Sequence, residues 1–215
     1  MRTPSGITAF LLIWALFVAG LLVLVLTTDR FALHVLMQPV HTPFLDRSFS
    51  TITHLADGIV PTILALILLY FGTMRSFLMM GLGCSFGALV TQGLKRGPFA
   101  HMDRPFMFQD ALVDLPWVSG LELNHHFSFP SGHATAAFNM CFALAVLIPG
   151  RFRGIGFALL AGLLAYSRVY LSQHFTEDIL AGAVVGTITS LLVYVLLYRS
   201  SYSTRAWLDR RLRAS

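Results

Sequence analysis

Charged residues are scarce in this chain of 215 residues, because Asp, Glu, Lys and Arg together make up only 12% of it. A soluble domain of this length carries about twice that fraction. Hydrophobic residues account for 56% of the chain, and the mean hydropathy is +0.72. The shortage of charge therefore excludes an ordinary soluble protein. It predicts a polytopic membrane protein built as a single domain over residues 1–215.

Cysteine and lysine are also nearly absent. The two cysteines, Cys84 and Cys141, lie inside apolar runs, which excludes a disulfide framework. Lys95 is the only lysine, and five arginines lie in the last seventeen residues. No basic–aromatic module of the kind that binds nucleic acid accompanies this charge. The position of these arginines after an apolar run predicts a basic cytoplasmic tail, 199–215, that contacts anionic lipid headgroups. The net charge of +5 is therefore not taken to indicate a nucleic-acid partner.

Long apolar runs are what the sequence contains in abundance. The first, 7–27, is too long for the core of a cleavable signal peptide and lacks a small-x-small cleavage site, so we expect a transmembrane helix. At about 20 residues per span, the chain has room for six such helices. The predicted fold is therefore all-α, with six transmembrane helices. The five further spans are 59–73, 76–94, 134–148, 154–167 and 179–197.

The segments between these runs have their own patterns. Apolar residues recur at helical spacing between Leu45 and Ala56, which predicts an amphipathic helix at the membrane interface. A tight turn is expected at Met74-Arg75, and a long polar and aromatic loop over 96–130. Small residues at 182 and 186 in the last span predict a glycine face for close helix packing.

The distribution of charge predicts the orientation of the spans. With both termini in the cytoplasm, nine basic residues face that side and six face the other, in accord with the positive-inside rule. Nine of the ten acidic residues and all eight histidines then lie on the outer side. Four aromatic residues from Tyr194 to Trp207 are typical of an interfacial belt. The nine basic residues are Arg2, Arg75, Arg151, Arg153, Arg199, Arg205, Arg210, Arg211 and Arg213.

Three polar clusters lie at span ends that this topology places together on the outer side. An ionisable residue at such a position is a candidate for function. Cations that converge on one pocket repel one another unless an anion joins them, so the clusters predict an anion site at the outer interface. They are Lys95 with Arg104-Pro105, then Pro130-Ser131-Gly132-His133, then Ser167-Arg168 with His174 and Asp178.

The residue types in the clusters suit a phosphoryl group. Lys95, Arg104 and Arg168 would neutralise a tetrahedral dianion, and arginine can grip two oxygens at once. Ser131 stands at a helix start, where free backbone N–H groups favour an anion. Gly132 lets a phosphate approach that backbone.

The two histidines and Asp178 suit proton transfer and nucleophilic attack. Either His174 and Asp178 share a helical face, or His174 ends a loop and Asp178 lies in the first turn of the last helix. In both geometries the carboxylate can hold one ring nitrogen and leave the other free for attack. His133, arriving from another helix, could protonate a leaving oxygen. A metal site made from these three residues is chemically possible, but the nearby cations would repel the metal.

These residues resemble the type 2 phosphatidic acid phosphatase superfamily, which also includes vanadium haloperoxidases. The family pattern is Lys-x6-Arg-Pro, then Pro-Ser-Gly-His, then Ser-Arg-x5-His-x3-Asp. The second and third blocks match in full at 130–133 and 167–178. The first departs, because eight residues separate Lys95 from Arg104, and Arg96 could take the place of Lys95. With the six spans, the resemblance covers about residues 55–198.

The resemblance implies a lipid phosphatase that uses neither a metal nor another cofactor. By analogy, His174 attacks phosphorus to give a phosphohistidine, His133 protonates the departing oxygen, and Asp178 orients His174. Lys95, Arg104, Ser131, Gly132 and Arg168 would hold the phosphate. The expected substrates are undecaprenyl diphosphate, phosphatidylglycerol phosphate, phosphatidic acid or lipid A phosphates. The expected location is a bacterial inner membrane, with the site on the periplasmic side.

Other interpretations stay open from the sequence. A lipid hydroxyl could replace water, which would make the protein a phosphotransferase. The cationic mouth could instead belong to a transporter or a structural membrane protein that binds anions without catalysis. A haloperoxidase would need bound vanadate. The adjacent pair His125-His126 could touch the substrate, and the oligomeric state is left undetermined.

Overall fold

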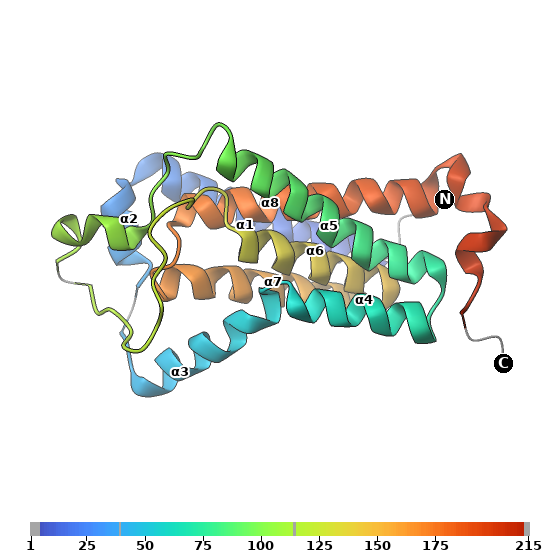
Figure 1. Cartoon of the computed structure of the whole chain (residues 1–215), viewed down its shortest axis with the longest axis horizontal. Coiled ribbons are helices and arrows are strands. Elements are labelled where there is room, and N and C mark those ends of the chain that lie inside the picture. Colours follow the sequence, from blue (N-terminus) through green and yellow to red (C-terminus); the bar gives the residue numbers. More distant parts are fainter. Residues whose placement is uncertain (1–4, 39, 114, 213–215) are drawn as a thin grey trace.

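A computed structural model describes residues 5–38, 40–113 and 115–212, and within these ranges the chain is helical and without strands. Six long helices run along the long axis of the molecule, and two short helices lie at one end (Figure 1). Arg2 and Arg213, which the sequence places in the cytoplasm, lie outside the described residues. The helices are α1 (Ser5–Thr27), α2 (Arg30–Leu36), α3 (Pro43–Ile52), α4 (Ile59–Phe71), α5 (Met74–Arg96), α6 (Gly132–Leu147), α7 (Arg151–Tyr170) and α8 (Thr176–Tyr194).

Helices occupy all six predicted apolar segments. Four of them, α1, α5, α7 and α8 with its continuation to Arg199, are long and apolar enough to cross a membrane. A fifth crossing results if α3, with its continuation to Ala56, forms one span with α4, to which it is bent by 45° at a short break. Helix α6 is apolar but has only 16 residues. The predicted all-helical membrane fold is confirmed, while the number of six spans stays a prediction.

Short polar side chains set where the helices begin. Thr42 accepts a hydrogen bond from the Leu45 amide and caps α3, so the predicted amphipathic segment is helical. Thr73 likewise accepts from the Ser76 amide and caps α5. The predicted turn at Met74-Arg75 is therefore wrong, because both residues lie in the first turn of α5. The chain reverses two residues before Met74, at Gly72, where a Cβ atom would lie 2.6 Å from the Leu68 carbonyl oxygen.

Helix α6 forms the centre of the bundle, since most of its residues are buried (Figure 1). Helices α5, α7 and α8 pack around it, and α1 covers α7 and α8 from outside. Phe10 of α1 meets Phe138 and Phe142 of α6 edge to face, at 6.5 and 5.4 Å between ring centroids. This packing fixes α1 against the middle of α6.

Two glycines let α6 and α8 approach closely. A Cβ atom at Gly182 would lie 2.6 Å from the Ser131 carbonyl oxygen, and one at Gly186 would lie 2.4 Å from the Thr135 carbonyl oxygen. Carbonyl oxygens belong to the helix backbone and cannot move aside cheaply. The predicted glycine face is therefore present, and it presses α8 against the first turns of α6.

We expect Gly186→Ala to destabilise the folded protein. Overpacking a tight interior costs roughly 1–3 kcal/mol, and each kcal/mol lowers the melting temperature by about 2–4 °C at this chain length. Gly156→Ala is the matched control, because a Cβ atom on that α7 glycine would meet nothing within 4 Å. Thermal unfolding of both variants in detergent measures the effect. Equal melting temperatures for the two variants would contradict the close approach.

The basic tail folds back onto the start of α5. Arg75 donates to both carboxylate oxygens of Asp209, each at 2.9 Å, and the Met74 amide donates to the Arg210 carbonyl oxygen at 3.0 Å. Leu208 is buried in the same contact. The described part of the tail is therefore docked, and its contact with lipid headgroups stays a prediction. The tail lies at the opposite end of the bundle from α2 and α3 (Figure 1).

Candidate active site

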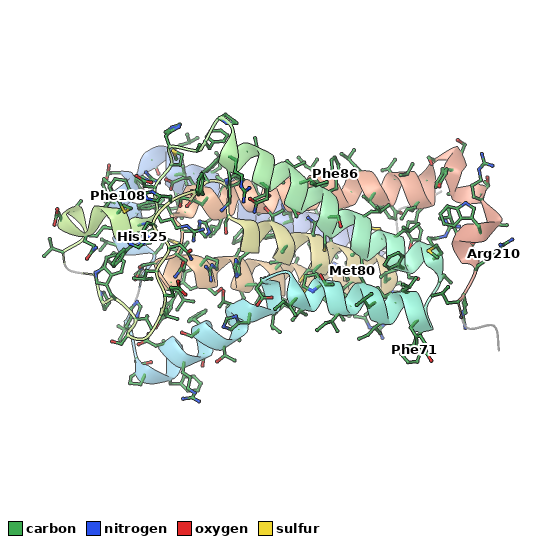
Figure 2. All side chains as sticks on the ribbon, in the orientation of Figure 1. Phe71, Met80, Phe86, Phe108, His125 and Arg210 are labelled. Atoms are coloured by element: carbon green, nitrogen blue, oxygen red, sulfur yellow. The ribbon has the colours of Figure 1, made fainter. Side chains whose placement is uncertain are left out.

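The three polar clusters come together at one end of the bundle. Lys95 lies in the last turn of α5, His133 in the first turn of α6 and Arg168 in the last turn of α7, and His174 lies just before α8. Because consecutive helices run in opposite directions, these ends of the four helices share one side. In Figure 2 that is the end where His125 and Phe108 are labelled, and Arg210 marks the other end.

A cavity of about 330 Å³ opens between these helix ends. Six of the eight residues predicted for the site line it. Ser131 and Asp178 are fully buried behind the wall. The six residues are Lys95, Arg104, Gly132, His133, Arg168 and His174; polar neighbours in the same wall include Asp57, Thr91, Gln92, Asn124 and Thr135.

A carboxylate holds the ring of His174 from behind. Asp178 Oδ2 lies 3.2 Å from His174 Nδ1 and also accepts the Phe175 amide at 2.9 Å, which caps the start of α8. Of the two geometries left open by the sequence, the second is correct: His174 ends a loop and Asp178 lies in the first turn. Ser128 donates to the same oxygen at 2.5 Å. Sequence reasoning missed Ser128, because nothing local separates it from other serines.

The three cations of the cavity are held by neutral oxygens. Lys95 Nζ donates to the Phe127 carbonyl oxygen at 2.8 Å, and Arg168 Nη1 donates to a threonine hydroxyl at 3.0 Å. Arg104 donates to the carbonyl oxygens of two other residues at 3.0 and 3.1 Å. Among the described residues, no carboxylate forms an ion pair with any of the three, and Arg168 Nε is buried without a partner. Such uncompensated charge suits an anionic ligand.

Lys95 and Arg96, the two candidates for the first cation of the site, lie in different surroundings. Lys95 is only 6% exposed and faces the cavity, whereas Arg96 is exposed and lies outside the cavity lining. Successive residues of a helix point about 100° apart, so only one of the two can face a given cavity. The longer spacing of the first block is absorbed in the loop before Arg104.

The surroundings keep the His174 ring neutral. Burial, together with the positive charges of Arg104, Lys95 and Arg168, holds the pKa of His174 well below its usual value. A neutral ring whose Nδ1 is occupied by Asp178 has its Nε2 lone pair available. Burial also lowers the pKa of Arg104, against the attraction of Asp178, but an arginine remains charged.

The first turn of α6 forms one wall of the cavity. Ser131 caps the helix, because its hydroxyl accepts from the Ala134 amide at 3.3 Å. The Ser131 amide donates to the Asp178 carbonyl oxygen at 2.9 Å and ties α6 to α8. A Cβ atom at Gly132 would meet no atom closer than 4.0 Å, so this position opens onto the cavity. The free amides at the start of a helix are suited to bind an anion.

Comparison with known families identifies the fold and the cluster order together. The family model of the PAP2 superfamily matches residues 73–202, which include all three polar clusters. The chain belongs to the PAP2 superfamily. The predicted family is thereby confirmed, although the α1–α4 region lies outside the matched range.

Individual proteins resemble the PAP2 chain over shorter stretches. A lipid A 4'-phosphatase of Bacteroides thetaiotaomicron is 29% identical over 102 residues, which is 47% of this chain and 45% of that protein. The chain thus spans less than half the length of that relative. The crystal structure of Aquifex aeolicus LpxE is 27% identical, with a TM-score of 0.65 over 75% of this chain and 92% of that one.

A second solved structure covers nearly the whole chain. It is that of a transmembrane PAP2-type phosphatidylglycerolphosphate phosphatase from Bacillus subtilis, with a TM-score of 0.63 over 94% of this chain and 98% of that one. Its sequence identity is 22%, so the likeness establishes the fold alone.

Two further expectations concern the rim of the PAP2 cavity. His125 and His126 are exposed and lie outside the cavity lining, while the neighbouring Asn124 lines it. His126 Nδ1 instead lies 2.7 Å from a carboxylate oxygen of Asp103. Within the described ranges, no three His, Cys, Asp or Glu side chains lie close enough to share one metal ion. Removal of metal ions with EDTA tests whether activity needs a metal.

Proposed function

We propose that this protein is a single membrane-embedded domain that removes phosphate from a membrane lipid through a phosphohistidine, without a metal. One observation carries the proposal: His174 is held by Asp178 in a cavity whose three cations have no carboxylate partner among the residues that the structure describes. An anion-binding protein would need the cations but not an oriented, neutral histidine. A nucleophilic phosphatase needs both.

The first step transfers the phosphoryl group to the protein. His174 Nε2 forms a bond to phosphorus as the bond to the lipid oxygen breaks. His133, which lines the same cavity from the first turn of α6, gives its proton to the departing oxygen. Asp178 stabilises the positive charge that develops on the His174 ring. Lys95, Arg104 and Arg168, with the amides near Ser131 and Gly132, stabilise the charge on the three remaining phosphate oxygens.

The second step releases phosphate. A water molecule gives a proton to His133, which is now neutral, and its oxygen attacks the phosphorus. The bond between phosphorus and His174 Nε2 then breaks, and the ring returns to its starting state. The same residue thus serves as acid and then as base. A lipid hydroxyl in place of water would give phosphotransfer by the same steps.

The substrate we propose is a lipid phosphate or diphosphate that stays in the bilayer. The apolar helices hold its tail while its headgroup reaches the polar end of the bundle. The relative from Bacteroides thetaiotaomicron is named a lipid A phosphatase, which supports this class. Phosphatidylglycerol phosphate is a further candidate of the class. Phosphatidic acid and undecaprenyl diphosphate belong to the same class. We place the protein in a bacterial inner membrane, with the cavity on the periplasmic side and both termini in the cytoplasm.

Phosphate release from a panel of lipids tests this proposal. Purified protein in detergent micelles is given phosphatidic acid, phosphatidylglycerol phosphate, undecaprenyl diphosphate and lipid A, each with and without EDTA. We expect release from at least one lipid at an unchanged rate in EDTA, since the proposed steps use only protein groups. If EDTA abolishes phosphate release and added metal restores it, the metal-free mechanism is contradicted. No release from any lipid would contradict the phosphatase itself.

A further inference from the structure

A segment outside the matched family range packs behind the loop that carries His174. It comprises residues 30–38 and 40–46, and we call it the clasp. The His174 loop, residues 171–175, joins α7 to α8. The cavity lies on the other side of this loop, and no described residue of the clasp lines it. The clasp therefore acts on a ligand in the cavity through the loop and the adjoining end of α7.

Gln38 is the central contact of the clasp. Its buried amide nitrogen donates to the Ser172 hydroxyl at 2.5 Å and to the Val169 carbonyl oxygen at 3.0 Å. The Nε2 atom of His34, which is also buried, lies 3.0 Å from the same nitrogen. Gln38 thus bridges the end of α7 and the loop residue two positions before His174.

The loop needs such support because its backbone is in an unfavourable conformation. Ser172 has a φ of 50°, in the left-handed region that residues other than glycine rarely adopt. Conformations of this kind persist only where the surrounding contacts hold them. The amides of Gln173 and His174 both donate to the Arg168 carbonyl oxygen, at 2.9 and 3.1 Å. A change in the backbone at Ser172 would therefore alter the orientation of the His174 side chain.

Gln38 is itself fixed from the other side. Its side-chain oxygen lies 3.1 Å from His41 Nε2, and His41 Nδ1 lies 2.9 Å from Asp46 Oδ1. The His41 ring stacks on Tyr170 at 4.3 Å between centroids, and the Tyr170 hydroxyl donates to Asp46 at 2.7 Å. These contacts leave the Gln38 side chain little freedom, as a positioning group requires.

Further contacts anchor the clasp to the start of α8. The Arg30 guanidinium lies 3.7 Å above the Phe175 ring and 2.5 Å from a carboxylate oxygen of Glu177. The His34 ring meets Phe175 edge to face at 5.1 Å. Burial, and the charge of Arg30, lower the pKa of His34 to about 4, so the ring is neutral in this packing. The clasp therefore contacts residues that precede and residues that follow His174 in the sequence.

We propose that the clasp positions His174 for attack on phosphorus, with Gln38 as the main positioning residue. The inference rests on the proposed function, because it assumes that His174 is the nucleophile. Loss of the Gln38 contacts would let Ser172 relax and would move the His174 ring. A displacement of about 1 Å at a reacting group can cost about 100-fold in rate. Lys95 and Arg168 are held outside this loop, and Arg104 keeps its hydrogen bond to the His126 carbonyl oxygen, so phosphate binding should change much less than the rate.

The test is a single-turnover measurement on Gln38→Leu. The probe is the 32P-labelled form of the panel lipid that the wild-type protein hydrolyses fastest, and labelled protein is trapped by quenching. We expect the rate constant of labelling to fall about 10- to 100-fold. The inhibition constant of inorganic phosphate should stay within about twofold. A merely structural role would lower the amplitude, because fewer molecules fold, but would leave the rate constant unchanged.

Matched variants make the result decisive. Gln109→Leu makes the same change at an exposed position of the short 3-10 helix Pro105–Ala111, outside the cavity lining, and should behave as wild type. Ser172→Ala removes only the hydroxyl that Gln38 binds, and it replaces Gln38→Leu as the test if that variant does not fold. We expect Ser172→Ala to slow labelling by about 3- to 10-fold. A wild-type rate constant in the variant that folds would overturn the inference.

The proposed function and this inference fail in different ways. A wild-type protein that releases no phosphate, or a His174→Ala variant that keeps full activity, contradicts the proposed function. An active wild type, an inactive His174→Ala and an unaffected Gln38→Leu contradict the positioning role alone. Equal losses in the rate constant and in phosphate binding would instead show that the clasp supports the whole cavity, and this too overturns the assignment to His174.

Discussion

His174→Ala is expected to lower phosphate release by at least about a thousandfold, to the background of the assay. Removal of a nucleophile from a covalent mechanism leaves only the catalysis that binding provides. Alanine also removes the ring that meets Asp178 and Ser128, so those two residues lose a partner behind the cavity. The measurement is release of inorganic phosphate from the preferred lipid, with folding checked by gel filtration and melting temperature.

His101→Ala is the matched control for this experiment, since His101 is an exposed loop histidine outside the cavity lining. It should keep wild-type activity. Inorganic phosphate should still bind to His174→Ala, because the three cations remain. Lost activity with retained phosphate binding distinguishes an enzyme from a protein that only binds anions. Full activity in His174→Ala, with a normal His101→Ala, would show that another group attacks phosphorus.

The second large effect is expected at His133, and it should depend on the leaving group. Protonation by a general acid contributes about 10²- to 10⁴-fold when the departing oxygen is a strong base, as in a lipid alkoxide. p-Nitrophenol leaves readily without a proton. We therefore expect His133→Ala to lose about 10²- to 10⁴-fold on a lipid monoester but much less on p-nitrophenyl phosphate.

The ratio of the two rates is the decisive measurement for His133. His174→Ala provides the comparison, because loss of the nucleophile should abolish turnover of both substrates. If His133→Ala loses the same factor on both, the residue serves phosphate binding rather than proton transfer. Its place in the lining of the cavity would then reflect contact with phosphate alone.

The helices could be predicted largely because hydropathy and capping are local properties. The run 7–27 lies wholly within α1, and the predicted third span corresponds to α5 but is two residues short at each end. The turn at Met74-Arg75 was misplaced, because an arginine in a break between apolar runs resembles a loop residue. Only the folded chain shows that Arg75 is in a helix and pairs with Asp209.

The candidate site was predictable in part for a related reason. The Pro-Ser-Gly-His and Ser-Arg-x5-His-x3-Asp blocks are short and continuous, and they predicted four residues that line the cavity: Gly132, His133, Arg168 and His174. The choice of Lys95 over Arg96 needed the rotation of α5 about its axis. The contacts of His34 with Ser172 and of His41 with Tyr170 could not be predicted, because these partners are far away in the sequence.

The sequence by itself determined that the chain is helical, lies in a membrane and carries three phosphate-type blocks, since each depends on neighbouring residues. The tertiary structure decided which side chains meet. Ser128 reaches Asp178 across 50 positions, and Gln38 reaches Ser172 across 134. Such pairs are selected by how helices pack and rotate against one another, and nothing in a serine's or glutamine's immediate neighbourhood specifies a partner that distant.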